Sequence, residues 1–330
     1  MAAADVTATP ARRPFTGRRV HLGDVILKGV AAATALGACA LVGLITWKVV
    51  DGAKTSIEKY GLGFATRIAW NPVVGHEIYG AASFIFGTVI TSFFALLLAT
   101  PLALGVALFL TELAPRAVKT PVTALVETLA AVPSVIIGLW GILVLGPALR
   151  TNIESWLHSA FGWIPLFGAP SAAGASIFTA IIVLAIMILP IVSSISRELF
   201  LGVPHELKEG ALALGTTRWE MVRGVVFPYA RGGIAAALIL GLGRAMGEAI
   251  AVTQVIGGGV FIHANLFGGG DTLASKIAAS YQGSTTNLST ASLVYLGLIL
   301  LVFSLLANVT AQWIVRRVAR KHGITRGGHA

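Results

Sequence analysis

Six long apolar runs constrain the fold of this 330-residue chain more than any other feature. They cover the residue ranges 27–50, 81–110, 121–149, 172–196, 232–257 and 291–315. A helix needs about 20 apolar residues to cross a bilayer, and each run meets that length. Backbone groups in lipid must be hydrogen-bonded within the segment, so such runs form helices. The sequence therefore predicts an all-α integral membrane protein with six transmembrane helices. We expect Pro101, Pro133 and Pro190 to kink helices that continue past them.

The polar content of the chain agrees with this class and argues against several functions. Only 12% of the residues are charged, whereas soluble domains carry about 25%. One cysteine excludes a disulfide framework and a cysteine-based metal cluster. The seven histidines are scattered, and the chain has no GxxxxGK(S/T) phosphate loop. We therefore expect no catalysis, no bound metal and no bound cofactor in this chain.

The basic residues predict the topology. Six spans place both termini on one side, and most Lys and Arg residues fall in the segments on that side. Basic residues accumulate in cytoplasmic loops, so both termini are predicted to lie inside. We expect residues 1–20 to form a disordered basic cytoplasmic tail, residues 21–318 to form one six-helix domain, and residues 319–330 to form a second tail.

The loop between the fourth and fifth runs, residues 202–229, is patterned as two short helices. Acidic residues suit the N-terminal end of the first helix, a glycine suits its left-handed stop, and a threonine with a glutamate three residues later reads as a capping box for the second. The residues of this pattern are Glu206, Glu209, Gly215, Thr217 and Glu220. An ordered loop on the inner side of a membrane protein indicates a docking partner.

The fifth run contains an ionisable pair near the middle of the bilayer, Arg244 and Glu248. The four-residue spacing places both on one helix face. Such charges are costly in a membrane unless they face each other, water or a ligand. One interpretation is a pair that fixes the register of two helices. The favoured one is an anion station, because a guanidinium matches the oxygens of phosphate or sulfate. Gly241, Gly243 and Gly247 allow a neighbour or a substrate to approach this helix closely.

Glu127 is a weaker candidate for the substrate path. It lies about six residues into the third run. A bond to a neighbouring helix near the membrane interface is the favoured interpretation of this carboxylate.

The docking loop resembles the ATPase-coupling motif of ABC importer permeases. That motif reads EAA, three residues, Gly, nine residues and then I-x-L-P. Here Glu209, Gly210 and Ala211 are followed by Gly215 and by residues 225–228, which end at Pro228. Gly210 replaces the middle alanine and should loosen its helix by about 1 kcal/mol.

Two further segments resemble the phosphate-uptake (Pst) permeases, most closely the PstC type. GLGRAMGEAIAV, starting at Gly241, is similar to a GRAxGETMAV signature, and residues 129–141 are similar to the signature of the third span. The resemblance covers residues 25–318. Ala249 stands where the family usually has threonine, so a hydroxyl is missing there. Thr253, one turn further on, is the candidate substitute.

The resemblance implies the architecture of a type I ABC importer permease in the inner membrane of a bacterium, surrounded by lipid. It implies phosphate as substrate, a heterodimer with a PstA-type permease, two ATP-binding subunits that carry ATP and Mg, and an extracytoplasmic phosphate-binding protein. The implied substrate path consists of Arg244, Glu248, Thr253 and Glu127. The implied ATPase-coupling residues are Glu206, Glu209, Gly210, Ala211, Gly215, Thr217, Glu220 and Pro228.

Two alternatives remain at this stage. The chemistry of arginine would also accept sulfate, molybdate or phosphonate in an ABC permease. A secondary anion transporter could use Arg244 and Glu248 as a proton relay. A helix-turn-helix that binds nucleic acid is disfavoured, because the loop is tethered to a span at both ends.

Overall fold

The computed structural model describes residues 22–171 and 173–321. They form helices joined by loops, and the only β-structure among them is a pair of isolated bridges. The chain divides into two compact units within helix α1 (Leu22–Tyr60). The first unit ends at Lys48 and the second begins at Val49.

Six helices in the described part of the chain are long and apolar enough to cross a membrane. They are Val25–Tyr60, Ala82–Leu113, Ser134–Phe161, Ile177–Leu201, Arg218–Gly247 and Asn287–Val315. The prediction of an all-α protein with six spans is thereby confirmed. The placement of both termini inside and the division into tails stay predictions. Residues 1–20, the expected N-terminal tail, lie outside the described residues, as do residues 322–330.

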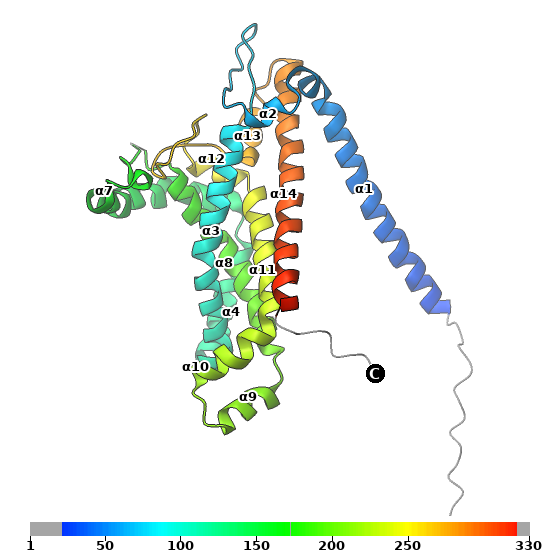
Figure 1. Cartoon of the computed structure of the whole chain (residues 1–330), viewed down its shortest axis with the longest axis vertical. Helices are drawn as coiled ribbons and strands as arrows, with labels where there is room; N and C mark the ends of the chain where they lie inside the picture. Colours follow the sequence, from blue (N-terminus) through cyan, green and yellow to red (C-terminus); the bar gives the residue numbers. More distant parts are fainter. Residues whose placement is uncertain (1–21, 172, 322–330) are drawn as a thin grey trace, which may run out of the picture. The chain divides into compact units, whose positions relative to one another are not determined.

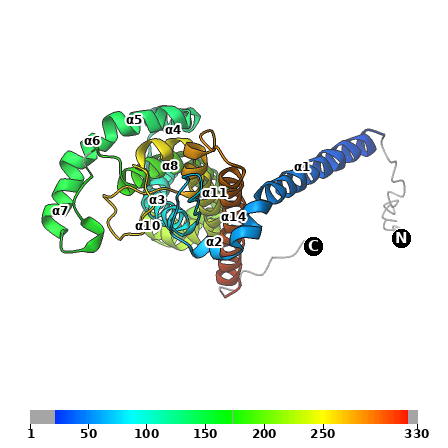
Figure 2. The same cartoon turned by 90° about the horizontal axis from the view of Figure 1, so that it is seen from above.

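Four helices form the bundle of the second unit (Figure 1, Figure 2). They are α3 (Ala82–Leu108), α8 (Ile177–Leu201), α11 (Phe227–Gly247) and α14 (Asn287–Lys321). Helix α8 packs against both α3 and α11. Ala95, Ala99 and Ala103 are fully buried and lie four residues apart on α3. These small side chains let α8 approach the backbone of α3 closely, as is usual between membrane helices.

The prolines behave in two ways. Pro101 lies within α3, which continues into a π-helix (Phe109–Leu113), and Pro190 lies within α8, so the predicted continuation of these helices is confirmed. The prediction for Pro133 was wrong. Helix α4 (Arg116–Ala131) ends before it, because the residue before a proline avoids the helical conformation, and Val132 has an extended ψ of 126°.

A new series of helical segments begins immediately after Pro133, so the expected single helix over residues 121–149 was wrong. The series consists of α5 (Ser134–Trp140), a π-helix (Gly141–Leu145), α6 (Gly146–Ala148), a second π-helix (Leu149–Glu154) and α7 (Ser155–Phe161). Figure 2 shows this series curving away from the four-helix bundle.

The fifth run is also interrupted, which contradicts the expected continuous helix over residues 232–257. Helix α11 ends at Gly247, Glu248 has an extended ψ of 116°, and α12 (Ile250–Val255) follows. Glycine is a poor helix former, so Gly247 favours an ending here. The two segments that follow the interruptions, α5 and α12, pack against each other. A Cβ atom on Gly138 of α5 would lie only 2.8 Å from the Cα of Ala251.

The loop between α8 and α11 lies at one end of the bundle, opposite α2 (Gly63–Thr66) and α13 (Leu273–Ser280) (Figure 1). It contains α9 (His205–Ala213) and α10 (Arg218–Met221), so the expected pair of short helices is confirmed. Gly215 has the predicted left-handed conformation, with φ of 85°. After α10 a π-helix (Val222–Val226) continues directly into α11, which carries Pro228 in its first turn.

Candidate functional site

Arg244 and Glu248 form the predicted ion pair at the interruption between α11 and α12. The Nη2 atom of Arg244 lies 3.2 Å from Oε2 of Glu248. The other carboxylate oxygen, Oε1, accepts a hydrogen bond of 3.3 Å from the backbone N–H of Ala251, in the first turn of α12. An anionic group at a helix N-terminus is stabilising there. Glu248 therefore holds the arginine with one oxygen and the start of α12 with the other.

The two side chains differ in exposure. The Glu248 side chain is 5% exposed, whereas that of Arg244 is 47% exposed. Arg244 lines a cavity of about 250 Å³. The other lining residues come from α4, the break after it, α5 and α8, and are Leu129, Ala130, Val132, Ile137, Met187 and Ile191. Arg244 is the only charged residue in this lining.

The cavity of Arg244 suits a small anion. Its volume of about 250 Å³ leaves room for several water molecules. The other side chains of its lining are apolar, so none of them competes with an anion for the guanidinium. A guanidinium has five N–H donors, so an ion pair with one carboxylate leaves it donors for a second partner.

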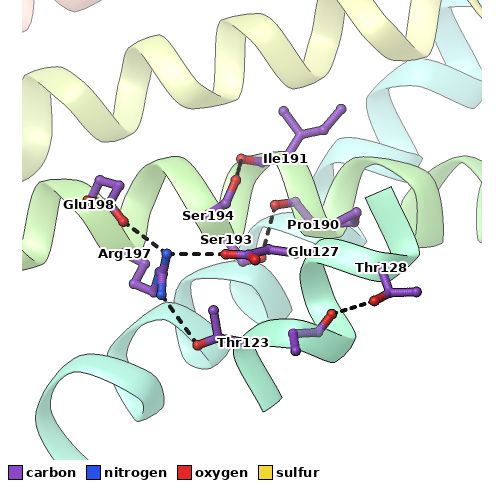
Figure 3. A network of polar contacts seen from close by, with 10 residues as sticks. Thr123, Glu127, Thr128, Pro190, Ile191, Ser193, Ser194, Arg197 and Glu198 are labelled. Carbon is purple, nitrogen blue, oxygen red and sulfur yellow. Dashed lines mark hydrogen bonds and ion pairs between the residues drawn. The ribbon is translucent and has the colours of Figure 1, made fainter. Parts of the chain in front are cut away.

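A second arginine lies further along the contact between α4 and α8 (Figure 3). Arg197 of α8 lies 3.5 Å from Oε1 of Glu127 on α4 and 3.0 Å from Oε1 of Glu198. Its Nη1 also donates to the hydroxyl of Thr123, at 3.3 Å. Glu127 is thus brought to a neighbouring helix, and it does not belong to the lining of the Arg244 cavity. With two carboxylates facing one guanidinium, this cluster suits an anion less well than Arg244 does.

Thr253 is not brought to the Arg244 cavity. It lies on α12, where its hydroxyl donates to the backbone oxygens of Ala249 and Ser275, at 2.7 and 3.3 Å. Within the described residues, no group of three or more His, Cys, Asp or Glu side chains is arranged to hold a metal ion.

The glycines of the arginine segment have different surroundings. A Cβ atom on Gly241 would lie 2.9 Å from a side-chain carbon of Ile188 on α8, so this glycine permits close packing of the two helices. At Gly243 and Gly247 a Cβ would meet no described atom within 4 Å. The expected close approach of a neighbour therefore holds for Gly241 alone among the three.

The predicted coupling residues gather on the loop that contains α9 and α10. Glu206, Glu209 and Gly210 are exposed on α9, while Ala211 packs against the apolar cluster at the ends of α8 and α11. Two large apolar side chains of the same loop, Leu214 and Trp219, are also exposed. Exposed apolar and acidic groups on one ordered loop form a suitable surface for a protein partner.

The capping box of α10 is formed as predicted. The hydroxyl of Thr217 accepts the backbone N–H of Glu220, and the Glu220 carboxylate accepts the backbone N–H of Thr217 at 2.7 Å. These bonds fix the turn that Gly215 begins, so the loop presents a defined shape.

Sequence reasoning missed several ion pairs, two of which join different helical segments. Arg197 pairs with Glu127, and Lys208 pairs with Glu112 at 2.6 Å, and the sequence around either basic residue indicates no such partner. Lys208 and Glu112 are 96 residues apart. Helical spacing detects partners within one helix, whereas a pair between helices gives no comparable local pattern.

Comparisons with known proteins agree with this fold. Residues 99–320 match the family described as "Binding-protein-dependent transport system inner membrane component". The chain is 41% identical over 320 residues to the phosphate transport system permease protein PstC of Mesorhizobium japonicum, covering 96% of this chain and 97% of the relative. A protein of the same name from Xylella fastidiosa (strain Temecula1) is 38% identical over 320 residues, with the same coverage of 96% and 97%.

A solved structure of a bacterial alginate ABC transporter contains a chain of similar fold. The TM-score is 0.59 at 18% sequence identity, and the match covers 90% of this chain and 97% of that one. At this identity the likeness shows a shared fold alone.

The helices, the loop and these matches define a class: a multi-pass membrane permease subunit of the ABC transporter type, and not itself an enzyme. The chain belongs to the family of inner membrane components of binding-protein-dependent transport systems and, within it, to the PstC permeases.

Proposed function

We propose that this chain is a permease subunit of an ATP-driven importer of inorganic phosphate and forms half of its translocation path. The observation that carries the proposal is the guanidinium of Arg244, which faces a cavity with otherwise apolar walls. The names of the relatives favour phosphate over other oxyanions. Sulfate, molybdate and phosphonate importers remain the chemical alternatives, because their oxygens match a guanidinium equally well.

In this proposal Arg244 is a transient station for the anion. The buried carboxylate of Glu248 partly neutralises the arginine and fixes its orientation. An arriving phosphate accepts hydrogen bonds from the guanidinium and competes with Glu248 for the positive charge. That competition keeps binding weak enough for release. The Arg197 and Glu127 pair lies along the same contact between α4 and α8, and we place it on the exit side of the station.

The proposed partners are a PstA-type permease, two ATP-binding subunits that carry ATP and Mg, and an extracytoplasmic phosphate-binding protein. The exposed residues of α9 and of the turn before α10, Leu214 among them, would dock the ATPase on the cytoplasmic side. This assignment of sides places both termini in the cytoplasm and follows the distribution of basic residues.

The continuity of the fifth helix supports a mechanical link between docking and transport. Arg218–Gly247 is helical for 30 residues without interruption, which corresponds to about 45 Å at a rise of about 1.5 Å per residue. It begins in the docking loop and carries Arg244 near its far end. Closure of the ATPases would move this rod, and the access to Arg244 would alternate between the two sides.

Uptake by the complete importer tests the proposal. Both permeases, the ATPases and the binding protein are reconstituted in vesicles, and uptake of radiolabelled phosphate is measured with ATP and with a non-hydrolysable analogue. We expect uptake with ATP and none with the non-hydrolysable analogue. Excess sulfate should compete only weakly with phosphate. Uptake by this chain by itself, driven by a pH gradient, would favour the secondary transporter. Stronger transport of sulfate would identify another oxyanion as the substrate.

A further inference from the structure

Lys208 of α9 is buried between two other elements of the bundle. Its Nζ atom donates to Oε1 of Glu112 at 2.6 Å and to the backbone oxygen of Phe200 at 3.1 Å. The side chains of Lys208 and Glu112 are only 10% and 13% exposed. Lysine is among the residues that are least often buried, and it is buried where it is paired. This ammonium group therefore has a specific position rather than a solvated one.

The two acceptors belong to different spans. Glu112 lies in the π-helix that extends α3, and Phe200 lies in the last turn of α8. The backbone carbonyls of a last helical turn lack partners within the helix and attract a cation. Lys208 thus joins α9 to the ends of both α3 and α8.

The remaining packing of α9 leads to a third span. Helix α9 packs on α10 and on the π-helix Val222–Val226, and both continue into α11. This packing connects α9 to α11, while the two bonds of Lys208, together with the apolar contact of Ala211, connect α9 to the ends of α3 and α8. The Arg244 cavity has walls from α8, at Met187 and Ile191, and from α11. A change of access to the cavity therefore involves walls that belong to both α8 and α11.

We propose that Lys208 is a positioning residue for energy coupling: by pairing with Glu112 and Phe200 it makes α3 and α8 follow the docking loop together with α11. The proposal rests on the proposed function as an ATP-driven importer. It assigns a role to a side chain that neither contacts the Arg244 cavity nor lies on the exposed docking surface.

Stability alone is a poor explanation of this pair. A buried ion pair is often no more stabilising than apolar side chains of similar size, although removal of one partner leaves a costly unpaired charge. The paired replacement Lys208→Met with Glu112→Leu removes both charges at once. In this variant a loss of coupling can therefore be distinguished from a loss of folding stability.

The experiment compares uptake per ATP hydrolysed in the reconstituted importer. For Lys208→Met with Glu112→Leu we expect assembly with the ATPase and ATP hydrolysis within about twofold of wild type. Uptake per ATP is expected to fall about tenfold, within the usual range of coupling between sites. Lys119→Met on α4 is the matched control, because Lys119 takes part in none of the ion pairs found among the described residues. It should keep the wild-type ratio.

Further variants keep the inference testable if the paired replacement assembles poorly. Lys208→Arg retains a positive charge beside Glu112, and we expect it to keep uptake per ATP within about threefold of wild type. Lys208→Met should lower the ratio as much as the paired replacement does, because either change breaks the same link. Wild-type coupling in the paired replacement, or uncoupling by Lys208→Arg equal to that by Lys208→Met, would overturn the inference. If wild-type protein showed no ATP-driven phosphate uptake, the proposed function itself would fail instead.

Discussion

Single residues in this protein combine structural and electrostatic tasks, and Glu248 is the clearest example. One carboxylate oxygen pairs with Arg244 and the other accepts a backbone N–H of α12. The interruption of the fifth helix and the orientation of the arginine therefore depend on the same side chain. The four-residue spacing predicted the pair, but it could not predict the interruption, because the same spacing also fits an unbroken helix.

Asp271 provides a prediction at the same scale. It is buried in the segment before α13, with Lys276 at 3.8 Å, and Gly259 donates its N–H to the carboxylate. Burial raises the pKa of this carboxyl, and Lys276, Gly259 and Ser275 offset the rise only in part. The folded state therefore binds the proton of Asp271 more tightly than the unfolded chain does. The contribution of the protonated Asp271 carboxyl to folding stability is complete below the ordinary pKa of aspartate, about 3.9. It is lost as the pH rises through the raised pKa of the folded state.

Asp271→Asn should therefore be more stable than wild type near neutral pH, because asparagine needs no buried charge while it still accepts hydrogen bonds. The difference should shrink as the pH falls toward the ordinary pKa. Thermal unfolding of the purified protein in detergent, followed across this pH range for both proteins, measures it. A stability difference that does not change with pH would show that the charge of Asp271 is not responsible.

At the scale of elements, the sequence predicted the number of spans well and their interruptions poorly. The apolar character of a segment, averaged over about 20 residues, indicates whether that segment can enter a bilayer. It does not indicate whether a run contains one helix or two. Pro133 stands inside an apolar run that continues on both sides, and the turn at Glu248 contains no proline at all. The segments that follow the two interruptions, α5 and α12, pack on each other, and the residues that make this contact are far apart in the chain.

Gly138→Ala tests that contact. The added Cβ would lie 2.8 Å from the Cα of Ala251, so α5 and α12 would have to separate. Overpacking of this kind costs about 1–3 kcal/mol. Thermal unfolding should therefore show a clear loss of stability. Gly105→Ala is the control, because a Cβ there meets no described atom within 4 Å. Equal stability of the two variants would contradict the close packing of α5 on α12.

Gly210→Ala tests the departure of α9 from the EAA motif. A Cβ on Gly210 meets no described atom within 4 Å, and alanine favours a helix over glycine by about 1 kcal/mol. Thermal unfolding should show a gain in stability, and co-purification with the ATPase should be kept. Gly215→Ala should instead destabilise the loop, because φ of 85° is unfavourable for alanine. A loss of stability in Gly210→Ala would show that the glycine has a role beyond helix formation.

The whole molecule joins a docking loop at one end of the bundle to a charged cavity within it. The uninterrupted helix from Arg218 to Gly247 makes this connection along the chain, and Lys208 makes it between helices. The sequence indicated both ends of the connection through the capping box of Thr217 and Glu220 and through Arg244 with Glu248. It could not indicate the links between helices, because their partners are distant in the chain.

The direct test of the account is radiolabelled phosphate uptake by the reconstituted importer with Arg244 replaced. Arg244→Ala removes the guanidinium from the cavity, and the loss of about 3 kcal/mol of charged hydrogen bonding predicts a fall in uptake of about a hundredfold. Arg244→Lys keeps the positive charge but lacks the planar guanidinium, so its uptake should lie between that of Arg244→Ala and that of wild type. Co-purification with the ATPase should be unchanged in both variants. Wild-type uptake by an assembled Arg244→Ala importer would contradict the assignment of Arg244 as the anion station.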